Sequence, residues 1–260
     1  MTIHANSLET YMFPCLTDNY GFLLHDTEKD LTATVDTPDV NAIEKALAIK
    51  NWKLTHILNT HHHWDHAGGN LELKRNTGCL IAGPLAEASM IPGIDIELHE
   101  GDIFQFGRFN ARVYDTPGHT SGHIVYHFES EHIAFVGDTL FAMGCGRLFE
   151  GTSEQMWHSL NKIIKWPDET RLYCAHEYTQ ANARFALTVE PHNRDLYIRS
   201  REVDKIRAAG EPTIPTTLVL EKKTNPFLRP HSRDIRRTIN MEKSSDLDVF
   251  TKIRNLKNAF

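Results

Sequence analysis

The chain has 260 residues, of which 40% are hydrophobic and 24% charged, a balance typical of a globular protein with a sizeable core. Its formal net charge is -6 and no dense basic block offsets it, which argues against a nucleic-acid partner. The N-terminus lacks a basic region followed by an apolar run, and no stretch reaches the ~18 apolar residues of a membrane span. We therefore expect a cytoplasmic protein that makes no membrane contact.

The cysteines are scattered along the chain and form no C-x-x-C pair, so neither a zinc ribbon nor a redox dithiol is indicated. They are Cys15, Cys79, Cys145 and Cys174. Thiols in a reducing compartment fit this pattern best.

The first half of the chain alternates apolar strand patterns with helix patterns, which is typical of an α/β fold. We predict strands at residues 9–14, 20–25, 33–36, 54–60, 79–82, 103–106 and 109–114. We predict helices at residues 39–50 and 71–75.

The second half begins with strands and ends with helix formers. We predict strands at residues 124–128, 132–136 and 171–175, and a helix at 153–166 with Ser153 as N-cap. Further helices are expected at residues 180–187, 194–209 and 246–259, whereas the proline-containing stretches 212–217 and 225–228 should be irregular. The composition changes near residue 176, which predicts two domains, residues 1–176 and 177–260.

A histidine-rich array, H-x-H-x-D-H, follows the strand at residues 54–60 and contains His61, His63, Asp65 and His66. In extended backbone, side chains two positions apart point the same way, so His61 and His63 can reach one metal ion. Asp65 and His66 could reach a second ion as the chain turns toward the next helix. The array alone permits two ions without requiring them, and a solvated polar turn is the alternative.

Three more polar residues, His119, Asp138 and His176, also come just after predicted strands. Each is weak evidence by itself, as is His123, because a single histidine at a strand end is more often a hydrogen-bonded turn residue. His62, His127 and His132 are interpreted as ordinary polar positions. Together the residues suggest that His61, His63 and His119 hold one ion, that Asp65, His66 and His176 hold another, and that Asp138 bridges both.

The potential metal ligands lie in four segments, in the order THHHWDHAGGN, TPGHTSGH, GDTLF and HEYT. The chain also contains TDNYGFLL, GCGRLFEGT, NPFLR and a terminal R-x-x-K-N-x-F. These segments resemble the metallo-β-lactamase superfamily, and within it the hydroxyacylglutathione hydrolase family, and the resemblance covers nearly the whole chain.

The resemblance implies a four-layer αββα sandwich that carries the metal ions, followed by a smaller helical domain that binds glutathione. It implies two divalent ions, most often zinc, with iron or manganese as alternatives that a His/Asp ligand set equally suits. A hydroxide held between the ions, with Asp65 and Asp138 as catalytic carboxylates, would attack the thioester of S-D-lactoylglutathione or a related 2-hydroxyacyl thioester. The products would be glutathione and D-lactate, which is the second step of methylglyoxal detoxification, and we expect the enzyme to be a monomer.

The resemblance also assigns glutathione binding to Arg147, Tyr178, Arg254 and Lys257. A ligand with two carboxylates needs fixed cations, and Arg254 and Lys257 share a helical face at i and i+3. Phe149 stands where some relatives have tyrosine, which removes a phenolic hydrogen bond. Cys145 lies in a tight glycine loop and is interpreted as structural, not as a nucleophile.

Two other functions remain open at this point. A single-iron glutathione persulfide dioxygenase of the same superfamily shares the metal motifs but would lack the C-terminal helical part. A non-catalytic metal-binding or sensor protein is the alternative from another class, although seven His/Asp residues exceed the closed set of four typical of structural zinc.

Overall fold

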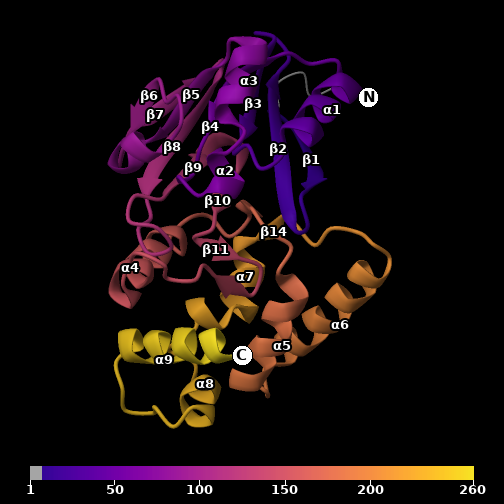
Figure 1. The fold of residues 1–260 in the computed structure, drawn as a ribbon. Helices are drawn as coiled ribbons and strands as arrows, with labels where there is room; N and C mark the ends of the chain where they lie inside the picture. Colours follow the sequence, from indigo (N-terminus) through magenta and orange to yellow (C-terminus); the bar gives the residue numbers. More distant parts are fainter. Residues whose placement is uncertain (1–7) are drawn as a thin grey trace. The chain divides into compact units, whose positions relative to one another are not determined.

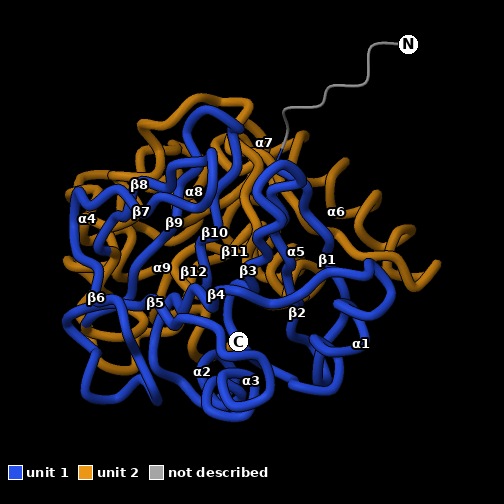
Figure 2. Tube along the Cα trace, turned by 90° about the horizontal axis from the view of Figure 1, so that it is seen from above, with its two compact units in different colours: residues 1–115, 122–137 blue, residues 116–121, 138–260 orange. Residues whose placement is uncertain are grey.

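The computed structural model describes residues 8–260, and the chain forms two compact units (Figure 2). Unit 1 contains the residues up to 115 together with 122–137, and unit 2 contains 116–121 together with 138–260. The predicted division at residue 176 stays a prediction. The expectation about the N-terminal segment involves residues 1–7, which lie outside the described residues.

The first sheet of unit 1 has six strands in sequential order. They are β1 (Glu9–Cys15), β2 (Asn19–Asp26), β3 (Leu31–Val35), β4 (Leu54–Leu58), β5 (Leu80–Pro84) and β6 (Ile96–Leu98). β1 to β3 are antiparallel neighbours, whereas β3 to β6 are parallel. Parallel neighbours end at the same edge, so the segments after β3 and β4 begin side by side, with Val35 paired to Leu58.

Helices cover one face of this sheet (Figure 1). The helical segments of this region are α1 (Val40–Lys50), α2 (Trp64–Ala67), α3 (Asn70–Thr77) and the 3₁₀ helix η1 (Leu85–Met90). Helix α1 begins at Asp39, whose carboxylate accepts a hydrogen bond from Ala42 N–H and caps the first turn. Ile43 of α1 and Leu73 of α3 pack with Leu23 of β2 in one buried cluster.

An antiparallel meander packs on the other face of the first sheet. It consists of β7 (Ile103–Phe106), β8 (Phe109–Asp115), β9 (Ile124–Phe128) and β10 (Ile133–Gly137), with the 3₁₀ helix η2 (Glu129–Glu131) between the last two. Phe22 of β2 contacts Phe135 of β10, with ring centroids 5.4 Å apart. Because successive side chains alternate across a strand, Leu23 faces the helices while Phe22 faces the meander. Unit 1 is therefore layered as helices, sheet and second sheet.

Unit 2 is mainly helical and contains two short strand pairs. The pairs are β11 (Leu140–Phe141) with β12 (Gly144–Cys145), and β13 (Arg171–Cys174) with β14 (Thr216–Thr217). The helices are α4 (Ser153–Ile163), α5 (Thr179–Val189), α6 (Arg194–Ala208), α7 (Leu218–Thr224), the 3₁₀ helix η3 (Pro226–Leu228), α8 (Arg233–Thr238) and α9 (Asp246–Ala259). Trp157 of α4 packs on Phe250 of α9, and the Asn225 side chain donates to the carbonyls of Phe141 and Gly144. The NPFLR segment thus holds the β11–β12 hairpin.

Most predicted elements are confirmed, and α9 has the predicted bounds. The N-cap of α4 was predicted wrongly: it is Thr152, whose hydroxyl accepts from Gln155 N–H while the Gln155 side chain accepts from Thr152 N–H. The expectation that residues 225–228 are irregular was also wrong, because the Asn225 side chain caps η3. No helix in residues 8–260 has the length and apolar character needed to cross a membrane.

Candidate active site

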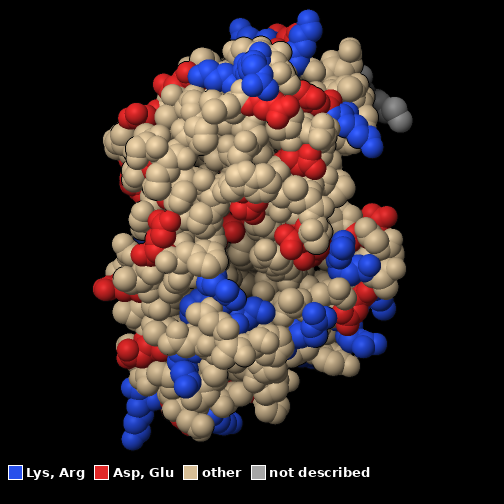
Figure 3. Space-filling view, viewed as in Figure 1, with Lys and Arg blue, Asp and Glu red and all other residues tan. Residues whose placement is uncertain are grey.

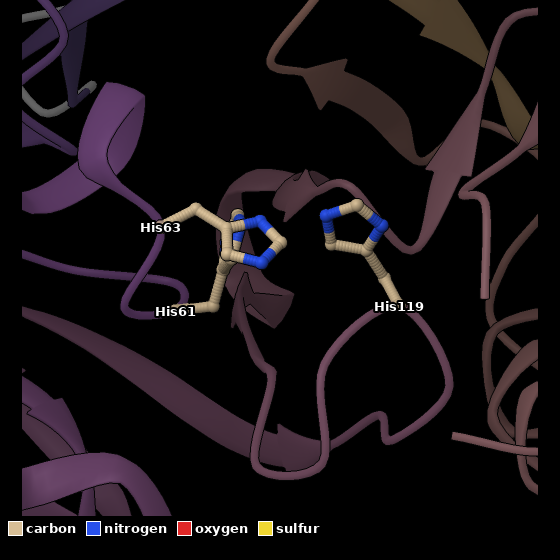
Figure 4. A group of neighbouring side chains, drawn as sticks. All are labelled: His61, His63 and His119. Carbon is tan, nitrogen blue, oxygen red and sulfur yellow. The ribbon is translucent and has the colours of Figure 1, made fainter. Parts of the chain in front are cut away.

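The H-x-H-x-D-H array lies in the loop after β4 and in α2, within unit 1. His61 Nε2 and His63 Nδ1 are 3.1 Å apart, and Figure 4 shows the two imidazoles close together. His66 Nε2 lies 3.5 Å from Oδ2 of Asp65. The His61 and His66 rings are also close, with centroids 4.0 Å apart, so the four side chains form one cluster and the division between two ions stays a prediction.

Asp36, the first residue after β3, orients two of these histidines. Its Oδ2 lies 2.8 Å from His66 Nδ1 and also accepts a hydrogen bond from the Thr60 hydroxyl, whose oxygen is 3.0 Å from His61 Nδ1. Because a carboxylate only accepts hydrogen bonds, the His66 proton is on Nδ1, and the Thr60 hydroxyl in turn accepts from His61 Nδ1. In both rings the lone pair is therefore on Nε2, the nitrogen that faces the other members of the array.

Asp65 receives a hydrogen bond from the buried Asn19, whose amide nitrogen is 3.1 Å from Oδ2. Neither Asn19 nor Asp36 was predicted to belong to the site. Asp36 was predicted to be the last residue of the strand at 33–36, whereas in the structure it is the first residue after β3. It therefore follows an apolar strand in the same way as the predicted ligands. That shared position was the signal that could have identified it.

In unit 2, Asp138 stands between two predicted ligands. Its Oδ2 is 3.3 Å from His119 Nε2 and its Oδ1 is 3.4 Å from His176 Nε2. All three side chains are buried. One carboxylate oxygen thus faces each histidine, which is the arrangement expected of a residue that bridges two ions.

The loop that follows Asp138 supports His119. His119, also drawn in Figure 4, places Nδ1 2.8 Å from the carbonyl oxygen of Arg147, so Nδ1 donates and Nε2 carries the lone pair. Gly146 comes so close to Asp138 that a Cβ there would lie 2.0 Å from the Asp138 carbonyl oxygen. Only glycine fits at this position without displacing the chain beside two predicted ligands.

The predicted substrate residues also belong to unit 2. The Tyr178 ring stacks on His176 with a centroid distance of 4.8 Å and an interplanar angle of 1°. The Arg147 side chain is exposed and lies over the Phe149 ring, 5.9 Å from its centroid. Phe149 also contacts His119 edge-on at 5.3 Å, so a hydrocarbon ring with no hydroxyl lies beside this histidine.

Arg254 and Lys257 lie on α9, with their nitrogens directed at neighbouring backbone. Arg254 is 4% exposed, and its Nη1 donates to the carbonyl of Cys145 at 2.8 Å. Lys257 Nζ is 3.3 Å from the carbonyl oxygen of Ala181. Burial, reinforced by the charges of Arg254 and Arg184, lowers the pKa of Lys257 to about 8.

None of His123, His127, His132 and Cys145 belongs to the clusters of potential metal ligands found among the described residues. His123 is buried and stacks on His61 at 4.8 Å, whereas burial in β9 lowers the pKa of His127 to about 4. His132 occupies a left-handed turn between β9 and β10. Burial raises the pKa of the Cys145 thiol, which keeps it protonated and suits the structural interpretation.

The donor chemistry of both units suits divalent cations. The described residues include clusters of His and Asp side chains whose nitrogen and carboxylate oxygen atoms are of the kind that bind such ions. In His61, His66 and His119 the second ring nitrogen is held by an oxygen acceptor, as it is in most metal-binding histidines. The residues present therefore fit metal ions.

Comparison with known proteins places the chain in a family. Residues 25–176 match the metallo-β-lactamase superfamily model, and residues 177–260 match the model of the hydroxyacylglutathione hydrolase C-terminus. A hydroxyacylglutathione hydrolase of Maricaulis maris is 53% identical over 95% of this chain and 97% of its own length, and one of Rhizobium etli is 51% identical over 97% and 99%. The chain belongs to the hydroxyacylglutathione hydrolase family.

Solved structures agree on the fold of this hydroxyacylglutathione hydrolase family member. The ETHE1 protein of Myxococcus xanthus superposes with a TM-score of 0.69 at 23% identity, covering 95% of this chain and 90% of that one. The BLEG-1 B3 metallo-β-lactamase gives 0.65 at 21% identity, covering 85% and 100%. The predicted α/β class, with a metallo-β-lactamase fold and a helical C-terminal part, is confirmed.

Proposed function

We propose that this protein hydrolyses the thioester of S-D-lactoylglutathione and related 2-hydroxyacylglutathiones, releasing glutathione and the 2-hydroxy acid. Its family membership supports this reaction, because the relatives described above are named hydroxyacylglutathione hydrolases and match nearly the full chain. The further question is which residues would carry out the binding and the chemistry.

The metal centre in this proposal is formed by the two sets of side chains together. The first ion would be held by the three histidines drawn in Figure 4, His61, His63 and His119. The second would be held by Asp65, His66 and His176. Asp138 would bridge the two, a role supported by the separate contacts of its two oxygens with His119 and His176.

When bound, the ions lower the pKa of water toward neutrality and polarise the thioester carbonyl, so no serine or cysteine nucleophile is required. Zinc is the proposed metal, and iron or manganese would suit the same ligands. Asp65 and Asp138 supply the negative charge of the centre. Asn19 fixes the Asp65 carboxylate, and Asp36 and the Arg147 carbonyl hold the imidazoles in the tautomer that the centre needs.

The proposed choice of substrate rests on one observation: several arginine and lysine side chains of unit 2 have no carboxylate partner. Among residues 8–260, none of Arg147, Arg184, Arg254 and Lys257 forms an ion pair with Asp or Glu within 4.0 Å. Arg254 is buried and Lys257 half-buried, and because burying a cation without a counter-charge is costly, an anionic ligand would remove that cost for these two residues. The two carboxylates of a glutathione thioester supply such charges, so we propose Arg147, Arg254 and Lys257 as their partners and Tyr178 as a lining residue beside His176.

The proposal divides the labour between residues 1–176, for metal binding and chemistry, and 177–260, for glutathione binding. A small molecule is the proposed partner. On the face drawn in Figure 3, Lys and Arg side chains lie among Asp and Glu side chains.

The four cysteines are buried reduced thiols, which supports a cytoplasmic location. We propose a monomer, which size-exclusion chromatography with light scattering would check.

The assay follows loss of thioester absorbance with S-D-lactoylglutathione, together with thiol release, oxygen uptake with glutathione persulfide, and elemental analysis of the protein. The hydrolase proposal predicts thioester loss with matching thiol release. Oxygen uptake without thioester loss would instead identify a persulfide dioxygenase. Bound metal with neither reaction would favour the sensor alternative.

A further inference from the structure

Close to the loop that follows β4, unit 1 contains a fully buried carboxylate that has no role in the proposed mechanism. It belongs to Glu87 on η1, and its side chain is 0% exposed. Oε2 accepts from both the backbone N–H and Nδ1 of His62, each at 2.8 Å. Oε1 accepts from the backbone N–H of Gly122, also at 2.8 Å. Both oxygens are thus engaged by loop donors.

The His62 contacts lie between the two histidines proposed for the first ion. Residues 59–63 have no regular secondary structure; backbone hydrogen bonds hold the two ends, from Asn59 to Ala82 and from Ala67 to His63, and Glu87 holds His62 in the middle. Two hydrogen bonds to one carboxylate fix both the peptide and the imidazole of His62. With the central residue held, His61 and His63 converge so that Nε2 and Nδ1 are 3.1 Å apart.

The Gly122 contact depends on a close approach of the two segments. A Cβ on Gly122 would lie 2.7 Å from Glu87 Cγ and 2.8 Å from the Ala86 Cβ. The absence of a side chain therefore lets the Gly122 N–H reach Oε1. Glu87 joins the His62 loop to a second segment of unit 1 through a single carboxylate.

We propose that Glu87 is a positioning residue for the first metal ion: it acts through His62 to hold His61 and His63 in their binding geometry. The proposal rests on the proposed function. It also gives His62 a role as the anchor of the loop, beyond that of a polar spacer. Residues that hydrogen-bond metal ligands directly typically contribute about 10- to 100-fold to metal affinity, and we expect a comparable effect from Glu87, which fixes the residue between two proposed ligands.

The test uses Glu87→Gln in the full-length protein loaded with zinc. The carboxamide accepts on its oxygen alone, so its NH₂ group must face either the His62 donors or the Gly122 N–H. Asp26→Asn is the matched control, because Asp26 is also a fully buried carboxylate of unit 1 and accepts from the backbone N–H groups of Glu28 and Arg108. Measurements are zinc per chain, the rate of zinc transfer to a chromophoric chelator, and the melting temperature of the metal-free protein.

We expect Glu87→Gln to lose zinc about 10- to 100-fold faster than wild type, whereas Asp26→Asn melts lower but keeps the wild-type rate. His62→Ala, which removes only the imidazole contact, should accelerate zinc loss less than Glu87→Gln does. Unchanged zinc loss in Glu87→Gln, or equal acceleration in Asp26→Asn, would overturn the inference. If Glu87→Gln does not fold, wild-type zinc retention by His62→Ala overturns it. A wild-type chain that binds none of zinc, iron and manganese would refute the proposed function instead.

Discussion

Nδ1 of His66 lies 2.8 Å from Oδ2 of Asp36, although the two residues are 30 positions apart in the chain. The contact forms because β3 and β4 are parallel neighbours whose following segments start at the same edge. Asp36 occupies a left-handed conformation with φ of 58°, which asparagine tolerates better than most residues. Asparagine therefore changes the hydrogen bonding of Asp36 while leaving its backbone largely unstrained.

Asp36→Asn should weaken metal binding about 10- to 100-fold, because Oδ1 of Asp36 accepts from Thr60 N–H while Oδ2 accepts from the Thr60 hydroxyl and His66, and an amide must turn its non-accepting NH₂ toward one of these two sets of donors. Chelator competition on the purified variant measures the change, and circular dichroism checks the fold. A variant with wild-type metal affinity would show that the Asp36 carboxylate does not support the centre.

Loss of a residue proposed to bind the second ion should remove metal and activity together. We expect His176→Ala to fall to about one ion per chain and to lose most thioesterase activity, because a binuclear centre stabilises charge through both ions. His192→Ala is the control, since His192 is an exposed histidine paired with Asp234. Full activity with a single ion in His176→Ala would contradict the two-metal proposal.

Substrate affinity should depend on pH through Lys257. Its ammonium form attracts a carboxylate, and its pKa is about 8, so KM should be flat in acid and rise as pH increases through that value. Bound substrate stabilises the ammonium and raises its pKa, which limits the effect on kcat. Lys257→Ala should have a higher KM at neutral pH and no rise, whereas Lys252→Ala, an exposed lysine on the same helix, should keep the wild-type profile. A rise that persists in Lys257→Ala would exclude this lysine as its cause.

Arg254 should affect stability as well as binding. Arg254→Ala removes the donor to the buried Cys145 carbonyl, which we expect to cost about 1–3 kcal/mol of the free energy of unfolding. It should also raise KM, and more strongly when combined with Lys257→Ala. Urea unfolding and steady-state kinetics separate the two effects. An unchanged KM in the double variant would remove both cations from the substrate site.

Cys145 should prove dispensable for the chemistry. Cys145→Ala keeps the small size that the glycine loop demands, and burial already holds the thiol protonated in the wild type. We expect kcat within a few-fold of wild type under metal-saturating conditions. A loss of several orders of magnitude, with metal content intact, would mean that the thiol participates.

The proposed ligands could be picked out from sequence because each follows an apolar strand, so that residue type and position coincide at His61, Asp138 and His176. The residues that orient them were harder to predict. Asp36 meets His66 only through the parallel pairing of β3 and β4, and Glu87 meets His62 from a 3₁₀ helix that has no clear periodic pattern. Short elements are hard to predict from sequence for the same reason. Helices α7 and η3 depend on Glu221 and Asn225, whose side chains hydrogen-bond to the β11–β12 hairpin.

Arg147 supports His119 with its carbonyl oxygen while its side chain is exposed over Phe149. Every amino acid supplies the same carbonyl, so the tautomer of this histidine does not depend on which side chain occupies position 147. The surface offered to a ligand there can change by single substitutions while the imidazole keeps its orientation. If His119 binds metal and Arg147 binds substrate as proposed, the two roles can be changed separately at position 147, which makes it a natural point at which to redesign the acyl or peptide preference of the enzyme.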